Sequence, residues 1–136
     1  MNKKHQNCPF CNTDLLWEGD RVLKKGQYCT LIVSNSQSIK GSMYIVTNEH
    51  KTSPFELSDE EILETNQFIK IAKQQMDQSL NCDGHNLGWN VGEVGGQALE
   101  HVHLHIIPRY QNEQFAGKGI RHWFKLEENR RSIQTP

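Results

Sequence analysis

The sequence is poor in several features that would place it in a special class of protein. Its 136 residues include few aromatic side chains (8%), only four prolines, and no apolar run long enough to cross a bilayer. The opening segment MNKKHQNCPF has no apolar core, so we expect no secretion signal. The formal net charge is -1, with both signs mixed along the chain. The sequence therefore lacks the excess of positive charge that is typical of a protein that binds duplex DNA.

The length of the chain predicts one globular domain of ordinary size. A chain of 136 residues can bury roughly two thirds of the surface that its unfolded form exposes, which is enough for a core without disulfides. We therefore expect a single cytoplasmic domain over residues 1–136, with no membrane partner and no nucleic acid polymer as partner. Residues 1–15 would form a cysteine-bearing N-terminal knuckle, and residues 111–136 a polar C-terminal tail with one short ordered piece around Trp123.

Cysteine is also scarce, and two of the four residues form a Cys-x-x-Cys pair in NCPFCN. In a reducing compartment, the pair Cys8 and Cys11 indicates a redox dithiol or half of a zinc site. The redox type opens a helix directly after a strand, and the residues before Cys8 do not predict a strand, so zinc is the better interpretation. Two further ligands must then complete the tetrahedron. Cys29 and Cys82 are predicted to be small, buried or half-buried side chains.

Apolar and β-branched runs predict five strands and one long helix. The strands cover residues 21–24, 28–33, 42–48, 85–91 and 101–109. The helix begins after Ser58, which forms the capping-box pattern with Glu61, and ends near Leu80. Its buried face is predicted from apolar residues at helical spacing, namely Ile62, Ile69, Ala72, Met76 and Leu80. This order of elements predicts an α+β fold with a mostly antiparallel sheet.

Three of the seven histidines stand at alternate positions in EHVHLHIIPRY. Side chains two residues apart on a strand point to the same face, roughly 6–7 Å from each other, so His101, His103 and His105 share a face. A half-exposed strand needs polar residues, but three histidines in register exceed that need. They indicate either a metal cage or a division of roles between a ligand, a nucleophile and an oxyanion partner. A third ligand on one straight strand usually lies too far from the ion for a cage.

The motif HVHLHII resembles the His-x-His-x-His-x-x signature of the histidine-triad (HIT) superfamily. Two further segments, KGSMYIVTNEHKTSPFELSDEEI and NVGEVGGQALEHVHLH, resemble the same family, and together the likeness covers roughly residues 8–110. It implies a single HIT domain with a HIT-like fold, assembled as a homodimer. The chain is most similar to the zinc-containing bacterial type and to dinucleoside polyphosphate hydrolases.

The resemblance also implies residue roles. His103 would attack the α-phosphorus of a nucleotide and form a nucleotidyl-histidine intermediate, a reaction suited to a neutral imidazole at pH 7. His105 would stabilise charge on the non-bridging phosphate oxygens, and Gln97 would contact the phosphate or the leaving oxygen. Further nucleotide-binding positions implied by the resemblance are Asn90, Gly96 and, at the ribose, Asn35 with Ser34 as the alternative.

The same resemblance completes the metal set. In the zinc-containing members, a Cys-x-x-Cys pair is joined by the histidine after the second strand and by the first histidine of the triad. Those positions are His50 and His101, so a structural zinc site is implied at Cys8, Cys11, His50 and His101. Two departures from the family pattern are Ser42, in place of a common histidine, and Ala98, in place of a Ser or Thr whose hydroxyl assists at the phosphate.

For function, the resemblance implies a hydrolase that cleaves dinucleoside polyphosphates at the α-phosphate. The segment Ile106–Arg109 after the triad is more similar to that branch than to the nucleoside phosphoramidases. A phosphoramidase or adenylate hydrolase with the same His103 chemistry is the alternative. A hypothesis of a different class, to which Ala98 gives weight, is a nucleotide-binding or zinc-stabilised interaction module without turnover. Trp123 either packs on the sheet, the reading we favour, or lies near a partner's base site.

Overall fold

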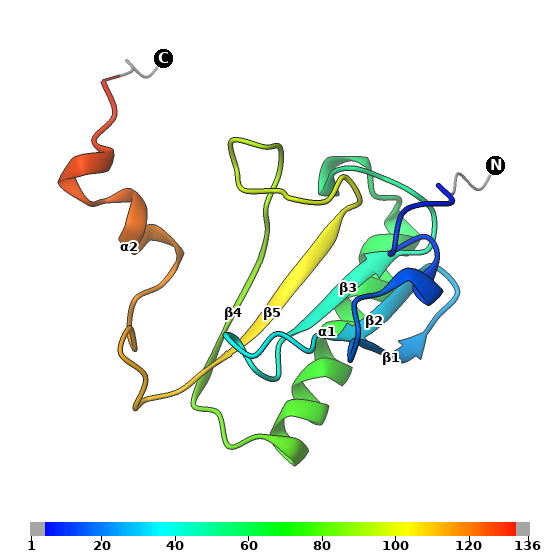
Figure 1. Ribbon diagram of the computed structural model, residues 1–136, viewed down its shortest axis with the longest axis horizontal. Coiled ribbons are helices and arrows are strands. Elements are labelled where there is room, and N and C mark those ends of the chain that lie inside the picture. Colours follow the sequence, from blue (N-terminus) through cyan, green and yellow to red (C-terminus); the bar gives the residue numbers. More distant parts are fainter. Residues whose placement is uncertain (1–4, 133–136) are drawn as a thin grey trace.

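A five-stranded antiparallel sheet with one long helix on one face forms the body of the protein (Figure 1). The computed structural model describes residues 5–132; residues 1–4 and 133–136, at the two ends of the predicted domain, lie outside the described residues. The strands are β1 (Arg21–Lys25), β2 (Cys29–Val33), β3 (Met43–Thr47), β4 (Gly84–Trp89) and β5 (His103–Arg109). The helices are α1 (Asp59–Ser79), α2 (Ile120–Phe124) and three short 3-10 turns at Thr13–Leu15, Pro54–Glu56 and Glu127–Asn129.

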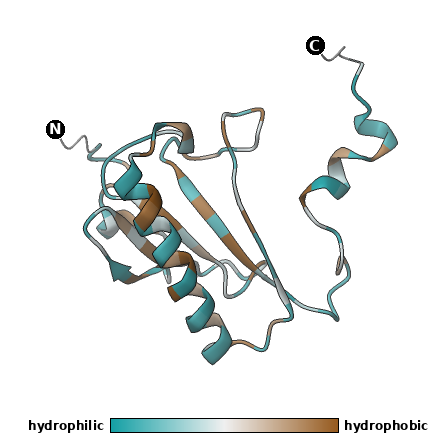
Figure 2. Ribbon diagram, turned by 180° about the vertical axis from the view of Figure 1, so that it is seen from behind, coloured by the Kyte–Doolittle hydropathy of each residue, from teal (hydrophilic) through white to brown (hydrophobic). Residues whose placement is uncertain are grey.

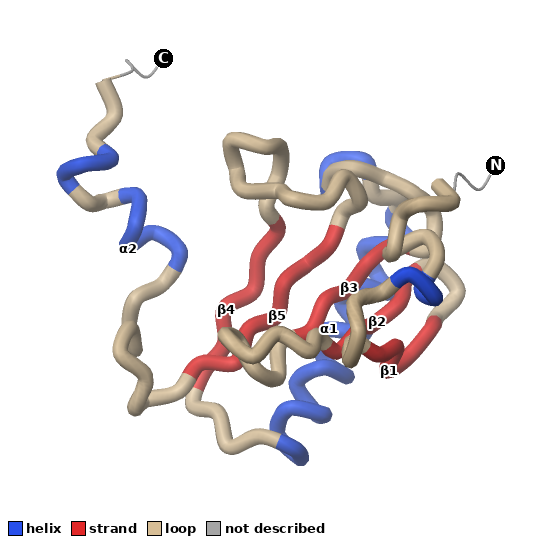
Figure 3. The backbone as a smooth tube through the Cα atoms, viewed as in Figure 1, coloured by secondary structure: helices blue, strands red, loops and turns tan. Residues whose placement is uncertain are grey.

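The sheet has the strand order β1-β2-β3-β5-β4, and every neighbouring pair is antiparallel (Figure 3). The predicted α+β class with a mostly antiparallel sheet is therefore confirmed. Predicted strand ends differ from the observed ones by one or two residues. β5 begins at His103 instead of residue 101 because the backbone N–H of His101 bonds to Leu99 and that of Val102 bonds to Lys51, outside the sheet ladder.

Local capping explains where α1 begins. The hydroxyl of Ser58 accepts the backbone N–H of Glu61 at 3.1 Å, and the Glu61 carboxylate accepts the N–H of Ser58 at 2.8 Å. These reciprocal bonds satisfy donors that the first helical turn would otherwise leave without partners. The predicted capping box and the helix end at Leu80 are confirmed.

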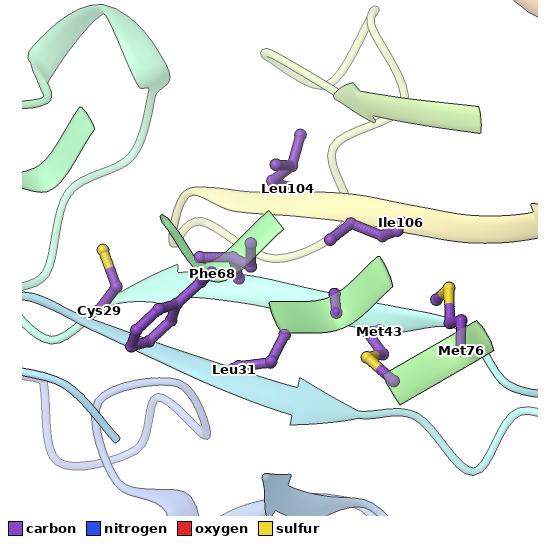
Figure 4. Close-up of a cluster of buried hydrophobic side chains, with 9 residues drawn as sticks. Cys29, Leu31, Met43, Phe68, Met76, Leu104 and Ile106 are labelled. Atoms are coloured by element: carbon purple, nitrogen blue, oxygen red, sulfur yellow. The ribbon is translucent and has the colours of Figure 1, made fainter. Parts of the chain in front are cut away.

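One face of α1 packs against the sheet and forms the main core (Figure 4). Phe68, Ala72 and Met76 are buried from the helix side. The sheet contributes buried side chains from three strands, namely Cys29, Leu31, Met43, Ile45, Leu104 and Ile106. The prediction that Cys29 is a small buried side chain is confirmed, and the half-buried Cys82 packs at the edge of the same cluster.

The predicted burial of Ile62 is wrong. Ile62 is 52% exposed, because the residue before it, Glu61, is the one that faces the protein and is only 3% exposed. Successive helical residues are rotated by about 100°, so a buried Glu61 turns Ile62 outward. Glu61 is held inward by an ion pair of 2.5 Å with Lys51 in addition to its capping bond, which lets a carboxylate stay buried.

The opposite face of the sheet is covered by the N-terminal knuckle and by the loop between β2 and β3 (Figure 1). Cys8 and Phe10 of the knuckle are buried against Ile32 and Val46 of the sheet. Residues alternate between faces along β5, so Leu104 and Ile106 enter the helix-side core, whereas His103 lies on the other face, against Phe10. Figure 2 shows the same alternation as bands of hydrophilic and hydrophobic residues along β5.

After β5 the chain turns away from the sheet and passes, on the β4 side but at a distance from it, through α2 to the 3-10 turn at Glu127–Asn129 (Figure 1). The short ordered piece predicted around Trp123 is this helix. Within residues 5–132, the structure contains no helix with the length and apolar content that a bilayer crossing would need.

Candidate active site and metal centre

Four side chains converge where the knuckle meets the sheet. One ligand atom from each of Cys8, Cys11, His50 and His101 lies within 4.8 Å of the others. The Cys8 sulfur is 3.4 Å from Nδ1 of His101, and the Cys11 sulfur is 3.2 Å from Nδ1 of His50. Ligand bonds of 2.0–2.3 Å in a tetrahedron place neighbouring ligand atoms roughly 3.3–3.8 Å apart, so these distances suit a zinc ion.

Chain topology brings these four residues together. The backbone N–H groups of Cys11 and Asn12 both bond to the carbonyl of Cys8, and this tight turn keeps the two sulfur atoms close. His50 follows β3 and His101 precedes β5, and because these two strands are antiparallel neighbours, the end of one lies beside the start of the other. The cluster therefore depends on contacts across more than 90 residues of sequence.

The orientation of His101 is fixed by a second bond. Its Nε2 donates to the backbone carbonyl of Thr47 at 2.8 Å, which leaves the Nδ1 lone pair for a metal. His101 is fully buried, and this burial lowers its pKa to about 4. The imidazole is therefore neutral at pH 7, the state that a metal requires.

His103 lies next to this cluster and is oriented by the backbone. Its Nδ1 donates to the carbonyl of His101 at 2.7 Å, so its Nε2 keeps a free lone pair. Burial lowers the pKa of His103, against a smaller opposing effect of that hydrogen bond, and its exposed fraction is 8%. A neutral imidazole with one nitrogen fixed and the other free can act as a nucleophile.

His105 differs from its neighbours in having a buried ring nitrogen without a hydrogen-bond partner. Its ring centroid is 4.8 Å from that of His103, and its Nε2 is the one buried side-chain nitrogen or oxygen in residues 5–132 that has no hydrogen-bond partner. Burial, assisted by His103, lowers the pKa of His105 to about 4. An unpaired buried polar atom costs roughly 1–3 kcal/mol, so its presence beside a candidate nucleophile indicates a place for a ligand atom.

Two aromatic residues that the sequence reasoning did not select surround the histidines. The ring of Phe10 lies 5.7 Å from His101 and 5.2 Å from His103, and Tyr44 lies 5.8 Å from His103 and 5.3 Å from His105. Tyr44 is the β3 residue directly opposite His105 in the sheet. Alternation along SMYIVTN could have placed Tyr44 on the outward face, but only the strand register places it opposite His105.

The loop between β4 and β5 carries three of the residues predicted to contact the nucleotide. The Gln97 side chain donates to the carbonyls of Thr52 and Leu99 at 2.8 and 3.0 Å and accepts the N–H of Gly92 at 2.9 Å. Gln97 therefore holds this loop against the segment after β3. Asn90 is exposed and donates to the carbonyl of Gly96 at 3.4 Å, where a φ of +92° favours glycine.

The predicted ribose residue Asn35 is not brought to the histidines by any contact among the described residues. It is exposed, its backbone N–H donates to Asp20 at 2.6 Å, and its side chain donates to the carbonyl of Glu18 at 3.1 Å. Ser34 is nearly buried and continues the alternation of Ile32, which packs on the knuckle side of the sheet. The geometry therefore favours Ser34, the alternative, on the face that carries the triad.

Comparisons with known proteins agree with this geometry. A family model described as the HIT domain matches residues 18–112. An uncharacterised HIT-like protein of Methanocaldococcus jannaschii is 38% identical over 111 residues, which cover 78% of this chain and 81% of that protein. Adenosine 5'-monophosphoramidase of Schizosaccharomyces pombe is 30% identical over 80 residues, covering 59% of this chain and 57% of that protein.

Solved structures share the fold. A HIT family protein from Bacillus anthracis superposes with a TM-score of 0.71 at 27% identity, covering 91% of this chain and 89% of that one. A diadenosine triphosphate hydrolase from Plasmodium falciparum gives 0.63 at 28% identity, covering 68% and 63%. A Zn-bound histidine triad family protein from Mycobacterium smegmatis gives 0.66 at 19% identity, covering 85% and 86%. With its histidines in register and the family model matching most of its length, this chain belongs to the HIT family.

Proposed function

We propose that this protein hydrolyses dinucleoside polyphosphates at the α-phosphate, with Nε2 of His103 as the nucleophile. The observation that carries the proposal is the bond from His103 Nδ1 to the carbonyl of His101, beside the unpartnered Nε2 of His105. Nδ1 of His103 is fixed by its hydrogen bond, and Nε2 of the same ring is free to attack. Nε2 of His105 still lacks a hydrogen-bond partner, so it can bind a ligand atom. The membership of the HIT family supports a nucleotide as the substrate.

The reaction proceeds in two displacements. His103 Nε2 attacks the α-phosphorus, the bond to the leaving nucleotide's oxygen breaks, and that oxygen keeps the electron pair. The ring becomes positively charged in the nucleotidyl-histidine, and the Nδ1–H bond to the His101 carbonyl strengthens as it does so. Water then attacks the phosphorus, the P–N bond breaks with its electron pair returning to Nε2, and the water gives up its proton to solvent. This releases the mononucleotide and returns His103 to its neutral form. His105 meets the non-bridging oxygens on which charge collects.

Two similar proteins support two substrate branches. The Plasmodium protein is named as a diadenosine triphosphate hydrolase, and the Schizosaccharomyces protein as an adenosine monophosphoramidase. Both branches are compatible with the same histidine chemistry, and we place this chain in the dinucleotide branch. The phosphoramidase branch is the alternative, and a nucleotide-binding module without turnover is the alternative of a different class.

Product analysis tests these functions together. The purified protein and its His103→Asn variant are incubated with diadenosine tetraphosphate and, separately, with adenosine phosphoramidate. We expect AMP release from the dinucleotide, lost in the variant while nucleotide affinity is kept. Faster cleavage of the phosphoramidate would move the protein to the other branch, and nucleotide binding without cleavage of either substrate would contradict the enzyme proposal. His85→Asn, on β4 beside Cys82, is the matched control and should keep full activity.

We also propose that Cys8, Cys11, His50 and His101 hold a structural zinc ion. The tight donor set, the buried position and the bond from His101 Nε2 to Thr47 support this choice. When bound, the ion would tie the knuckle to β3 and β5 and so keep Phe10 against His103. Turnover itself depends on the histidines and not on the ion.

A homodimer is the third part of the proposal. An apolar hollow of about 790 Å³ lies between α1, the Pro54–Glu56 turn and the outermost strand β4. Its lining includes large exposed side chains, namely Phe55, Ile62, Leu63, Trp89 and Val91. Apolar area of this kind, next to a strand at the sheet edge, favours a second copy of the chain as its cover.

Light scattering after size exclusion tests the dimer. We expect Leu63→Glu to shift the mass from two chains to one, because a charge in an apolar interface is costly to bury. Gln67→Glu, on the same helix but not in the hollow, should leave the mass unchanged. A monomeric unaltered protein would refute this part. The cytoplasmic location and the lack of membrane or polymeric nucleic acid partners stay predictions of the sequence.

A further inference from the structure

The segment after β5 has not been given a role in the candidate active site. The family model ends at residue 112, whereas the described chain continues to residue 132. This segment carries several large exposed side chains, namely Phe115, Ile120, Trp123 and Phe124. It lies on the β4 side of the sheet and stands off from that edge strand along most of its length (Figure 1).

Arg109 anchors the segment to the sheet. Its Nε donates to Glu113 at 2.7 Å, and its two terminal nitrogens donate to the carbonyls of Lys118 at 2.9 Å and Phe115 at 2.7 Å. A further bond from the same guanidinium reaches the side chain of Asn86 on β4. One rigid side chain at the end of β5 therefore fixes residues 113–118 relative to two strands.

The anchored segment encloses a hollow of about 660 Å³, together with the loop before β3 and the end of β5. The rings of Phe115 and Trp123 line it and lie 5.4 Å apart at their centroids. Lys40 and Lys118 also line it, and within residues 5–132 neither forms an ion pair. The one carboxylate in the lining, Glu113, is neutralised by Arg109. Its volume is in the range of small-molecule sites.

The hollow continues from the face of the triad. Ile107, in its lining, is two residues beyond His105 and points to the same side of β5. The side chain of Ile120 from α2 lies over Gly88, 3.6 Å from the position a Cβ would take, and Gly88 is the residue opposite His105. Four residues of extended strand separate His103 from Ile107, a distance of about 13 Å.

We propose that this hollow binds the distal nucleoside of a dinucleoside polyphosphate, the part that leaves when His103 attacks. The rings of Trp123 and Phe115 face the base, as aromatic side chains do in nucleotide sites, and the amines of Lys40 and Lys118 meet the phosphates of the leaving group. The inference rests on the proposed function and deepens it. A substrate with a small leaving group cannot reach the hollow, so only long substrates benefit from it.

The test compares a long and a short leaving group in the same variants. We expect Trp123→Ala to lower kcat/KM for diadenosine tetraphosphate about tenfold, mainly through KM, since a lost base-stacking contact costs roughly that factor. Cleavage of adenosine phosphoramidate should change less than about twofold, because that substrate does not extend past His105. Phe124→Ala, on the same helix but outside the lining, is the matched control.

A second variant checks the anchor. Arg109→Gln removes most of the bonds that hold the segment, so it should reproduce the selective loss for the dinucleotide while far-ultraviolet circular dichroism stays unchanged. Equal losses on both substrates, or no loss on either, would overturn the proposal. If the unaltered protein cleaves neither substrate, calorimetry on His103→Asn decides instead. Tighter binding of diadenosine tetraphosphate than of AMP, abolished by Trp123→Ala, would then support the hollow while the proposed function fails.

Discussion

His101 and His105 are the same residue type, four positions apart on one side of one chain segment, and burial lowers the pKa of each to about 4. Their surroundings differ. His101 has Nε2 bonded to Thr47 and Nδ1 directed at the sulfur of Cys8, whereas Nε2 of His105 has no partner. The comparison shows that alternation in sequence selects the face of the sheet, and that neighbours from distant parts of the chain select the role.

The two ends of the triad also differ in what covers them. The knuckle buries Phe10 and Cys8 against the His101 end, so this end is closed. Beyond His105, the sheet face continues past Gly88 into the hollow formed with the C-terminal segment. A closed end suits a structural ion, and an open end suits a ligand that must enter and leave.

Removing the proposed zinc ion should have the largest effect. Cys8→Ala should lower the free energy of unfolding by at least about 3 kcal/mol, because structural zinc contributes its binding free energy to folding. Elemental analysis should find one zinc ion per chain in the unaltered protein and none in the variant, and calorimetry should show the lower Tm. Cys82→Ala, half-buried outside the cluster, is the control. Unaltered protein that purifies without zinc, or a Cys8→Ala variant that keeps both the zinc and the Tm, would refute the site.

Alanine substitutions at His105 and at His101 should separate an effect on activity from an effect on stability. His105→Ala should reduce kcat by about 10²–10³-fold, as expected for a lost donor at the transition state, with little change in Tm. His101→Ala should instead lower the Tm, because it removes a proposed zinc ligand and leaves a cavity at a fully buried position. Steady-state kinetics and thermal unfolding of both variants provide the measurement. A drop in Tm of equal size in the two would erase the distinction.

Much of the fold could be predicted because its signals are local. The capping box at Ser58 and Glu61 lies within four residues, and the alternation of polar and apolar side chains in β5 is visible within a segment of seven residues. The error at Ile62 arose because spacing alone does not reveal that Glu61 turns inward to Lys51, ten residues away. Prediction therefore failed where a buried ion pair, and not apolar periodicity, determined the rotation of the helix.

The site was predictable in part, for a different reason. The Cys-x-x-Cys pair indicated a metal from its own spacing, but His50 and His101 were assigned only through the family resemblance. Tyr44 was missed because its place opposite His105 depends on the register of β3 with β5. The C-terminal hollow was missed because it depends on Arg109 reaching Asn86, a residue 23 positions earlier. Such long-range pairings leave no periodic trace in a single sequence.

Acidification should affect the His105 end measurably. Its pKa is about 4 in the folded protein and near 6.5 when unfolded, so between these values the unfolded chain binds a proton that the folded chain does not. The contribution of neutral His105 to the free energy of unfolding is therefore fully present above pH 6.5 and is lost as the pH drops toward 4. Urea unfolding across this range should show a shallower fall for His105→Gln than for the unaltered protein. Parallel curves would mean that His105 does not carry the effect.

The smallest expected effect concerns the residue behind His101. Nε2 of His101 bonds to the backbone carbonyl of Thr47 at 2.8 Å, whereas the Thr47 hydroxyl is 3.4 Å away and donates to Glu49. Thr47→Val removes the hydroxyl but keeps the carbonyl, so zinc affinity should change less than about tenfold. Loss of a hydrogen bond that orients a metal ligand would lower the affinity by about tenfold or more. Competition with a chromogenic chelator measures this change. A larger loss would show that the hydroxyl orients His101, and would move the control of the metal end from the backbone to a side chain.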